Sequence, residues 1–278
     1  MLNLRSRREI DAMRKAGELV WQAHAALAES VRPGVTTAEL NDIVEDIFRR
    51  AGAEAVFKTV AGPVPFPAAT CISVNEQIVH GVPGDRPLHE GDIVSVDTAC
   101  RLDGWCGDAA VTHPVGAISR EHQRLLEVTA AAFRRALELI PQCRWWSQVA
   151  SEMERLVKAA GCSVVRDLVG HGVGRELHEP PQVPNFAIAR GSASDFELLP
   201  GLVLAIEPMV NAGGEAVRRQ ADGWTQVTAD GRYSAHFEHT VAIGPGRQPR
   251  LLTGPPENSP HDGLWPVGRG TGPPPGAA

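Results

Sequence analysis

Two aspartates on either side of a tight-turn signal could do chemistry together. Asp97 ends the apolar segment 93–96, and Asp103-Gly104, which lies between it and Asp108, is a strong signal for a two-residue hairpin turn. If this dipeptide is the turn, Asp97 faces Ala110. Asp108 then lies on the same face, because side chains alternate along a strand. The two acids become diagonal cross-strand neighbours, with Cβ atoms about 7 Å apart.

This pair of acids predicts a cation site. Two like charges so close together in a core are unfavourable unless a positive group lies between them, and metal ions are a natural answer. The alternative that these two residues alone leave open is a solvated hairpin face. The apolar character of segment 93–96 argues against a strand that is wholly in water.

Two glutamates support the interpretation as a metal site. Glu207 ends the apolar segment 202–206, where a carboxylate is rarely left without a partner. Glu238 lies in segment 235–240, and taken alone it would most often be a surface residue. Together with Asp97 and Asp108, these glutamates make a set of four acids that could line one cleft.

Three histidines lie in or near glycine- and proline-rich segments. His171 has a glycine on each side, which allows a close approach of backbone or ligand, while His178 follows seven residues later and His80 lies in segment 79–84. The glycines do not have the Gly-x-Gly-x-x-Gly spacing and helix opening of a nucleotide loop. Each histidine alone is more often a packed or surface residue. Beside four acids, the three are candidates for metal binding and proton transfer.

Carboxylates with one imidazole suit harder divalent ions. Iron(II), manganese and cobalt fit such a set better than a thiolate-type zinc site does. Two ions about 3.5 Å apart would share bridging carboxylates and a bridging water, whose pKa they would lower. The four acids would also offset the four positive charges of the two ions.

Four amphipathic helices and several short strands are expected to position these groups. Thr36 and Glu39 form a capping box, and Gly52 lies just past the end of the helix that begins there. Apolar spacing predicts helices over residues 6–28, 36–51, 119–139 and 145–160. Segments rich in β-branched residues predict strands over residues 71–74, 93–98, 164–168, 203–206 and 237–243.

The order of these elements suggests an internal duplication. A shift of 109 residues places Gly52 on Gly161, and a shift of 110 places segment 91–97 on segment 201–207. Each of these two segments is a glycine turn, a buried strand and a carboxylate. Chance similarity of short apolar strands is the alternative. Two helix–helix–strand units that face each other would surround a central cleft with paired carboxylates.

Composition excludes several classes of protein. A formal net charge of -6 gives no basic surface for nucleic acid, and the longest apolar runs are too short to span a membrane. No apolar stretch follows the N-terminal arginines, so a secretory signal is not expected. Five cysteines without a Cys-x-x-Cys pair favour reduced thiols in a cytoplasmic protein.

The end of the chain differs from the rest in composition. Pro, Gly and Ser dominate from about Gly244, without an apolar period. We expect residues 1–252 to form a single domain and residues 253–278 to be a disordered tail, because such a tail cannot bury enough surface to offset its chain entropy. The apolar segment 263–267 within the tail could dock on the domain.

The motifs, taken together, resemble those of the type I methionine aminopeptidases. The resemblance covers about residues 3 to 252, and as a set the motifs are highly specific. They lie at residues 71–75, 80–83, 91–97, 107–108, 170–174, 178–183, 206–211, 222–225 and 234–240.

The resemblance implies the pita-bread fold, an α/β (α+β) architecture in which two pseudo-twofold related units surround a dinuclear metal cleft. It also implies removal of the N-terminal methionine from nascent proteins, by hydrolysis of the first peptide bond with a metal-bridging water or hydroxide. The implied metal ligands are Asp97, Asp108, His171, Glu207 and Glu238. Of these, Asp108 and Glu238 would bridge the two ions.

The catalytic residues implied by the resemblance are His80, His178 and Glu207. His178 would hydrogen-bond the scissile carbonyl or amide, His80 would assist near the amine or leaving nitrogen, and Glu207 would accept a proton from the water. The resemblance also implies a monomer that acts on N-terminal methionyl peptides in the cytoplasm, with an Ala or Gly expected after the methionine. The ribosome is a candidate partner, and the identity of the metal stays open.

The implied methionine pocket contains Phe66, Cys71 and Trp224, for which plain core packing is the alternative without the resemblance. The sequence departs here from the commonest family pattern, which puts the pocket shape and substrate preference in doubt. The departures are Val60 for cysteine, Phe66 for tyrosine, Leu177 for an aromatic residue, Pro180 for glutamate and His236 for glutamine.

Four other readings are less consistent with the sequence. Proline-specific peptidases of the same fold usually carry an additional N-terminal domain, and type II methionine aminopeptidases carry a large insertion where only 28 residues separate His178 from Glu207 here. A non-catalytic module of this fold would have lost ligands that this chain keeps. A structural protein would leave the clustered acids unexplained.

Overall fold

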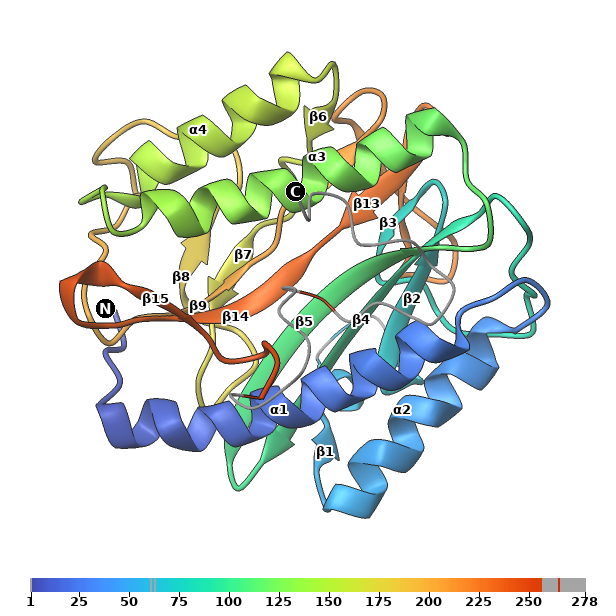
Figure 1. The fold of residues 1–278 in the computed structure, drawn as a ribbon, viewed down its shortest axis with the longest axis horizontal. Helices are drawn as coiled ribbons and strands as arrows, with labels where there is room; N and C mark the ends of the chain where they lie inside the picture. The colour runs from blue at the N-terminus through green and yellow to red at the C-terminus, as the bar shows by residue number, and fades with distance from the viewer. Residues whose placement is uncertain (1, 61, 63, 257–264, 266–278) are drawn as a thin grey trace.

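Two pairs of helices lie on opposite sides of the strands that cross the middle of the molecule (Figure 1). The structure is a computed structural model, and it describes residues 2–60, 62, 64–256 and 265. The first pair is α1 (Arg7–Ser30) with α2 (Thr37–Ala51), and the second is α3 (Arg120–Leu139) with α4 (Trp146–Ala159). All four predicted helices are therefore confirmed, with ends that differ by at most two residues.

Local sequence signals fix where the helices begin and end. Thr36 and Glu39 form the predicted capping box of α2, in which each side chain bonds the backbone N–H of the other. Ser6 and Glu9 form a second capping box at the start of α1. Gly52 ends α2 in the left-handed conformation, with φ 67°.

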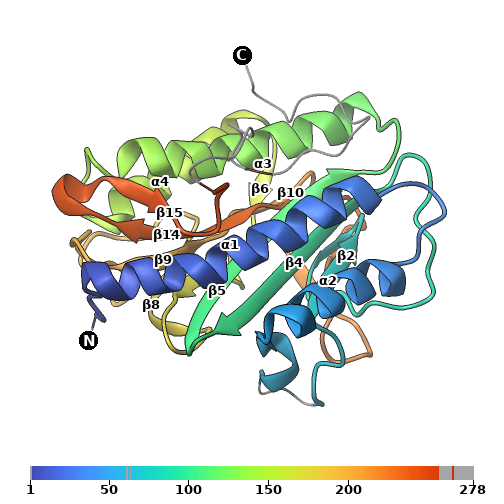
Figure 2. The ribbon, with the colours of Figure 1, turned by 60° about the horizontal axis from the view of Figure 1, so that its bottom comes forward.

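The central sheet is antiparallel and has nine strands in the described part of the chain, in the order β1-β4-β5-β14-β9-β7-β8, with β2 beside β4 and β15 beside β14. Figure 2 shows α1 crossing over β4 and β5, with α3 and α4 on the far side of β14. The strands are β1 (Glu54–Ala55), β2 (Thr70–Val74), β4 (Ile93–Leu102), β5 (Trp105–Pro114), β7 (Gly170–Gly172), β8 (Glu179–Val183), β9 (Val203–Ile206), β14 (Glu238–Ile243) and β15 (Pro249–Leu251).

Two smaller three-stranded sheets flank the central one. One has the order β13-β10-β6 and the other the order β11-β12-β3. The strand predicted over residues 164–168 is too long, because the chain leaves the sheet after Val165 and Arg166 turns to pair with Glu154 and Glu215. These strands are β3 (Gln77–Val79), β6 (Ser163–Val164), β10 (Met209–Asn211), β11 (Val217–Arg219), β12 (Gln226–Thr228) and β13 (Ser234–His236).

The β4–β5 hairpin has the predicted register. Asp97 lies opposite Ala110, and Asp108 lies opposite Ala99. The two turn residues, Asp103 and Gly104, both have positive φ values, 52° and 77°, which a two-residue turn of this kind requires. The acids are therefore diagonal neighbours on one face of the hairpin, as the sequence predicts.

The two halves repeat each other in backbone detail. Gly91 and Gly201 precede equivalent strands with φ values of 94° and 98°, and Gly161 matches Gly52 at the end of the second helix of its half. An isolated β-bridge joins Thr36 to Pro87 in the first half. Its counterpart joins Trp145 to Glu197 in the second half. Separate local features thus support the duplication that the sequence suggests.

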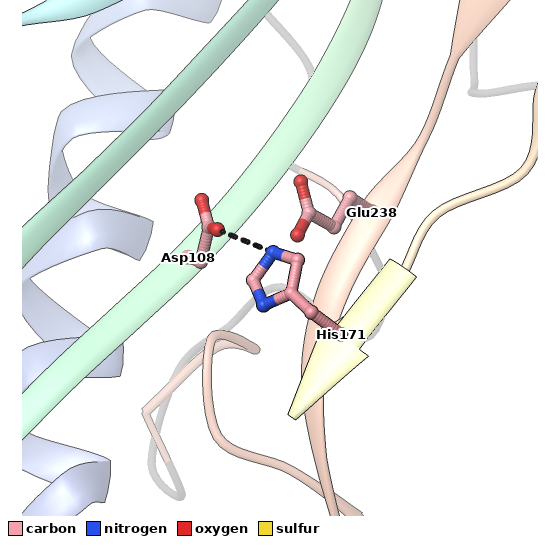
Figure 3. Close-up of side chains that lie close together, drawn as sticks. All are labelled: Asp108, His171 and Glu238. Carbon is pink, nitrogen blue, oxygen red and sulfur yellow. Dashed lines mark ion pairs between the residues drawn. The ribbon is translucent and has the colours of Figure 1, made fainter. Parts of the chain in front are cut away.

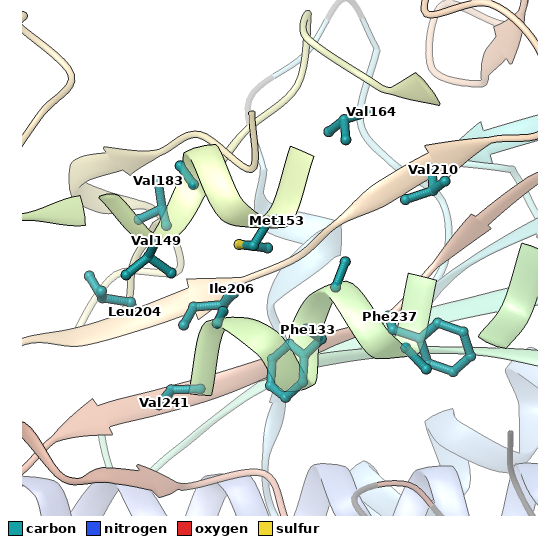
Figure 4. Close-up of a cluster of buried hydrophobic side chains, with 14 of the residues drawn as sticks. Phe133, Val149, Met153, Val164, Val183, Leu204, Ile206, Val210, Phe237 and Val241 are labelled. Atoms are coloured by element: carbon teal, nitrogen blue, oxygen red, sulfur yellow. The ribbon is translucent and has the colours of Figure 1, made fainter. Parts of the chain in front are cut away.

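Each helix pair covers its own part of the sheet with apolar side chains. In the second half, Phe133 of α3 and Met153 of α4 belong to one buried cluster with Leu204, Ile206 and Val241 of the sheet (Figure 4). In the first half, the buried cluster is formed by α1, α2, β2, β4 and β5. Burial on this scale stabilises the fold by about 25 cal/mol for each Å² of apolar surface removed from water.

The segment that follows β15 packs against α1. The Arg14 guanidinium donates hydrogen bonds to the carbonyl oxygens of Leu252 and Gly254, at 2.6 and 2.9 Å. Gly17 is needed at this crossing, because a Cβ atom there would lie 2.0 Å from the Leu252 carbonyl oxygen. This contact joins the C-terminal side of the domain to its first helix.

Part of the segment expected to be a disordered tail is buried. Thr253 and Trp265 expose 1% and 4% of their surface, and Trp265 docks against Phe133 and Phe237. The rest of that expectation, for residues 257–264 and 266–278, falls outside the described residues. Among the residues that are described, no helix is long and apolar enough to cross a membrane.

Candidate metal centre

Five strands bring acids and a histidine from both halves to one place. Glu238 of β14 lies opposite Ala110 of β5, which itself lies opposite Asp97 of β4, so these three residues form a row across the sheet. On the other side of β14, His171 of β7 lies opposite Ala205 of β9, close to the point where β9 ends before Glu207. Pairing of β5 with β14 therefore unites acids that are far apart in the sequence.

The imidazole of His171 faces the acids. Its Nε2 atom lies 3.5 Å from both Asp108 Oδ2 and Glu207 Oε1, and Glu238 is close enough to share one ion with Asp108 and His171 (Figure 3). Its Nδ1 atom lies 3.0 Å from the Gly172 carbonyl oxygen. An Nδ1–H that donates to this carbonyl leaves the Nε2 lone pair directed at the acids, as metal-binding histidines require.

The glycines beside His171 allow its strand to fit between two others. A Cβ atom on Gly170 would lie 2.3 Å from the Ala205 carbonyl oxygen, and one on Gly172 would lie 2.4 Å from the Pro180 carbonyl oxygen. The Val-Gly-His-Gly motif is thus explained by close packing of backbones on both sides. This packing fixes the position from which the His171 side chain reaches the acids.

The electrostatics of the acids require a cation. Burial, followed by the charge of Asp108, raises the pKa of Asp97, Glu207 and Glu238 well above ordinary carboxyl values. Within the described residues, none of the four acids pairs with a lysine or arginine, and Asp97 Oδ1, Asp108 Oδ1 and Glu238 Oε1 are buried without a hydrogen-bond partner. Divalent metal ions would supply the missing positive charge, so these donors fit metal ions.

Two threonine hydroxyls hold the backbone on each side of the cluster. Thr240 Oγ1 accepts a hydrogen bond from the Asp108 N–H and donates one to the Asp108 carbonyl oxygen, at 3.0 and 2.8 Å. Thr112 Oγ1 makes the same two contacts with His236, both at 2.8 Å. The Thr240 hydroxyl thus links β14 to β5, and the Thr112 hydroxyl links β5 to β13, so both join the first half of the chain to the second.

His236 is a residue of this site that the sequence analysis gave no role. It exposes 1% of its surface, and its Nε2 atom lies 3.8 Å from one oxygen of each of Glu207 and Glu238. Burial lowers the pKa of His236 to about 3, so its ring is neutral near pH 7. The spacing of two residues between His236 and Glu238, which places both on one strand face, could have indicated it.

His80 and His178 line the same cavity as the acids. The His178 ring packs edge-on against His171, with centroids 4.4 Å apart, and burial followed by the neighbouring His171 lowers the pKa of His178. Burial, then the charges of His178 and Arg219, lowers the pKa of His80 to about 4. Both imidazoles are thus neutral near pH 7, and each ring can donate one hydrogen bond and accept another.

An apolar pocket adjoins the acids. Phe66 packs edge-on against Trp224 at 5.3 Å between ring centroids, and His80 packs edge-on against the same indole at 6.4 Å. Cys71 lies opposite Asp97 in the β2–β4 pair, and burial raises the pKa of its thiol well above its usual range. The sequence analysis named these pocket residues but missed Phe57, which packs edge-on against Phe66 at 6.3 Å.

Acids, histidines and apolar pocket all line one cavity. Its volume is about 520 Å³. Among the residues that the structure describes, every predicted site residue lies on its wall: Phe66, Cys71, His80, Asp97, Asp108, His171, His178, Glu207, Trp224 and Glu238. The cluster of acids, which suits a cation, therefore adjoins a pocket that suits an apolar side chain.

Comparison with known proteins identifies the family. Residues 11–245 match the profile of metallopeptidase family M24. The chain belongs to metallopeptidase family M24. It is 47% identical over 254 residues to a methionine aminopeptidase of Clostridium perfringens, a match that covers 91% of this chain and 99% of that relative.

Solved structures agree with the assignment to family M24. A methionine aminopeptidase of Thermotoga maritima is 39% identical, with a TM-score of 0.85 over 91% of this chain and 99% of that one. A prolidase of Pyrococcus furiosus is 22% identical, with a TM-score of 0.68 over 91% of this chain and 66% of that one, and this likeness concerns the fold alone. The predicted pita-bread fold and the predicted resemblance are both confirmed.

Proposed function

We propose that this M24 metallopeptidase removes the N-terminal methionine from peptides and newly made proteins. The observation that carries the proposal is the single cavity in which buried acids adjoin an aromatic pocket. The pocket would hold the unbranched thioether side chain between Phe66, Cys71 and Trp224. The scissile bond would then lie beside Asp108, Glu207 and Glu238.

The metal centre would consist of two divalent ions, with cobalt, manganese or iron(II) as candidates. The ions would supply Lewis-acid activation of the attacking water and of the scissile carbonyl. Their proposed ligands are oxygen donors from both halves of the sheet and one imidazole: Asp97, Asp108, His171, Glu207 and Glu238. Asp108 and Glu238 are the two most deeply buried acids of this set.

Glu207 is the proposed general base. It lies at the end of β9 on the wall of the cavity, and only one of its oxygens is near His171. Its carboxylate would accept a proton from the attacking water and pass it to the leaving amine.

His178 and His80 are the proposed hydrogen-bonding groups. A neutral His178 ring, next to His171, would donate to the scissile carbonyl oxygen as negative charge develops on it. His80 would orient the amine or the leaving nitrogen. Its backbone is held in the left-handed region, with φ 58°, because Gly81 must pass within contact distance of the Ile72 carbonyl oxygen.

The proposed substrates carry a free α-amino group, which would lie against the acids in the cavity. A small residue such as Ala or Gly would follow the methionine. We further propose that residues 1–252 form the catalytic domain and that the protein acts as a monomer in the cytoplasm, on nascent chains that could be presented by the ribosome.

Release of free methionine from a Met-Ala-Ser peptide tests the proposed function. Metal-stripped protein would be reloaded with cobalt, manganese or iron(II) and compared with the Asp97→Asn variant. We expect metal-dependent release by the wild type, and none by the variant or from an N-acetylated peptide. Cleavage only of a peptide with proline in the second position would replace the proposal with a proline-specific activity. Inactivity on both peptides, without bound metal, would indicate a non-catalytic module.

A further inference from the structure

His236 faces the acid cluster, and among the described residues its ring has no hydrogen-bond partner. Both of its ring nitrogens are buried, and neither has a hydrogen-bond partner among the described residues. An unsatisfied buried polar group destabilises a fold, so native structures seldom keep one without a reason. Because Nε2 points toward Glu207 and Glu238, we expect the missing partner of this nitrogen to lie between His236 and these two acids.

The duplication shows which residue His236 replaces. Thr112 and Thr240 clamp the backbones of His236 and Asp108 through the same pair of hydrogen bonds. A shift of 128 residues, larger than the shift of 110 that relates segments 91–97 and 201–207, relates both Thr112 to Thr240 and Asp108 to His236. His236 is therefore the counterpart, in the second half, of an acid that faces the cluster from the first half.

The distances around His236 are compatible with a shared ion. Donor atoms bound to one ion at about 2.1 Å each lie no more than about 4.2 Å from one another. His236 Nε2 lies 3.8 Å from Glu207 Oε2 and 3.8 Å from Glu238 Oε2, and one potential ligand atom from each of the three residues lies within 4.8 Å of the other two. His236 also lines the cavity, so an ion can reach it.

We propose that His236 is a direct metal ligand, a second imidazole that binds the ion held between Glu207 and Glu238. This inference rests on the proposed function, because it concerns the same metal centre. Glutamine is common at this position in the family that the sequence resembles. The exchange of an amide for an imidazole would give the centre two nitrogen donors, His171 and His236, both from the second half of the chain.

A second imidazole has a consequence for the choice of metal. Imidazole nitrogen favours cobalt(II), iron(II), nickel(II) and zinc(II) over manganese(II), whereas carboxylate oxygen suits manganese well. The site formed by Glu207, Glu238 and His236 should therefore bind manganese less well, relative to cobalt, than the same site with glutamine in place of His236.

Proton NMR of the full-length protein loaded with cobalt(II) tests the assignment without any mutation. A ligating imidazole gives a strongly shifted N–H resonance that disappears in D₂O. We expect two such resonances in the wild type, one from His171 and one from His236, whose Nδ1 is buried. A single shifted resonance in protein that has bound two cobalt ions would overturn the proposal.

Variants assign the second resonance and measure its effect on binding. His236→Gln should remove one resonance and lower the cobalt affinity of one of the two sites at least about tenfold, as measured by isothermal titration calorimetry. Its manganese affinity should fall less. His113→Gln, which changes another buried histidine, on β5 of the central sheet, should keep both resonances and both affinities.

The outcomes separate this inference from the proposed function. If the wild type binds no cobalt, the metal centre itself is wrong and both proposals fail. If the wild type binds two ions, and His236→Gln keeps the same circular dichroism, resonances and affinities, only the assignment of His236 is overturned.

Discussion

The indole of Trp265 stacks on the imidazole of His239, with ring centroids 5.2 Å apart and ring planes inclined by 19°. Trp265 belongs to a segment rich in proline and glycine, yet it completes the apolar layer between α3 and β14. We expect Trp265→Ala to lower the free energy of unfolding by about 3 kcal/mol, the usual cost of removing a buried aromatic side chain. Urea denaturation measures this change.

Trp145→Ala serves as the matched control for Trp265. Trp145 is only partly buried, and it contacts Arg144 and Arg190 rather than the apolar core. Its removal should cost clearly less stability. Equal losses in the two variants would mean that the Trp265 contact adds nothing to the stability of the domain.

Glu207→Gln should nearly abolish the release of methionine. The amide keeps the size of the side chain but cannot accept a proton from water, so kcat should fall by about 10²–10⁴-fold. Because Glu207 is also a proposed metal ligand, metal content measured by mass spectrometry must accompany the kinetics. Glu176→Gln, a change of an exposed acid, is the control, and wild-type turnover by Glu207→Gln would refute the role as base.

Trp224→Ala should weaken the binding of methionine. Trp224 is half-buried at the cavity wall and packs edge-on against Phe66, so its loss opens the apolar pocket. We expect kcat/KM for Met-Ala-Ser to fall by about tenfold, the effect of about 1–3 kcal/mol of lost apolar contact, with metal content unchanged. Unchanged kcat/KM would show that the thioether binds elsewhere.

His113 should make the stability of the protein depend on pH. Burial, followed by the neighbouring His24, lowers the pKa of His113 from 6.5 to about 3. Between these values the unfolded chain binds a proton that the folded protein does not bind. The contribution of His113 to the free energy of unfolding is therefore fully present above about pH 6.5. Below that pH it decreases by about 1.4 kcal/mol per pH unit, as expected for one proton.

His113→Gln should remove this contribution. The free energy of unfolding, measured between pH 7 and pH 4, should fall less steeply in the variant than in the wild type. The comparison cancels the contribution of the metal-binding acids, which both proteins share. Parallel curves would contradict a neutral, buried His113.

Much of the site could be predicted because it follows local rules. The Asp103-Gly104 turn fixes the register of its hairpin, and the alternation of side chains then places Asp97 and Asp108 on one face. The duplication is visible because glycines with positive φ, such as Gly91 and Gly201, recur at the same places. Features that depend on one turn or one strand can be read from a sequence.

The remaining features depend on contacts between distant segments. No local pattern shows that β14 pairs with β5, which brings Glu238 beside Ala110. Nor does composition reveal that Arg14 would bind the carbonyls after β15, or that Trp265 would find a pocket. The role of His236 escaped for the same reason, since its position relative to Glu207 is set by the whole sheet.

The paired threonine clamps have a consequence for the direction in which a substrate can bind. A cleft with strict twofold symmetry would treat both directions of a peptide alike. Here the backbones repeat while the side chains differ, because Asp108 in the first half and His236 in the second occupy equivalent places, each bonded through its backbone to a threonine. The two ends of the cleft therefore differ in their side chains, and we expect a peptide to bind productively in only one of its two directions.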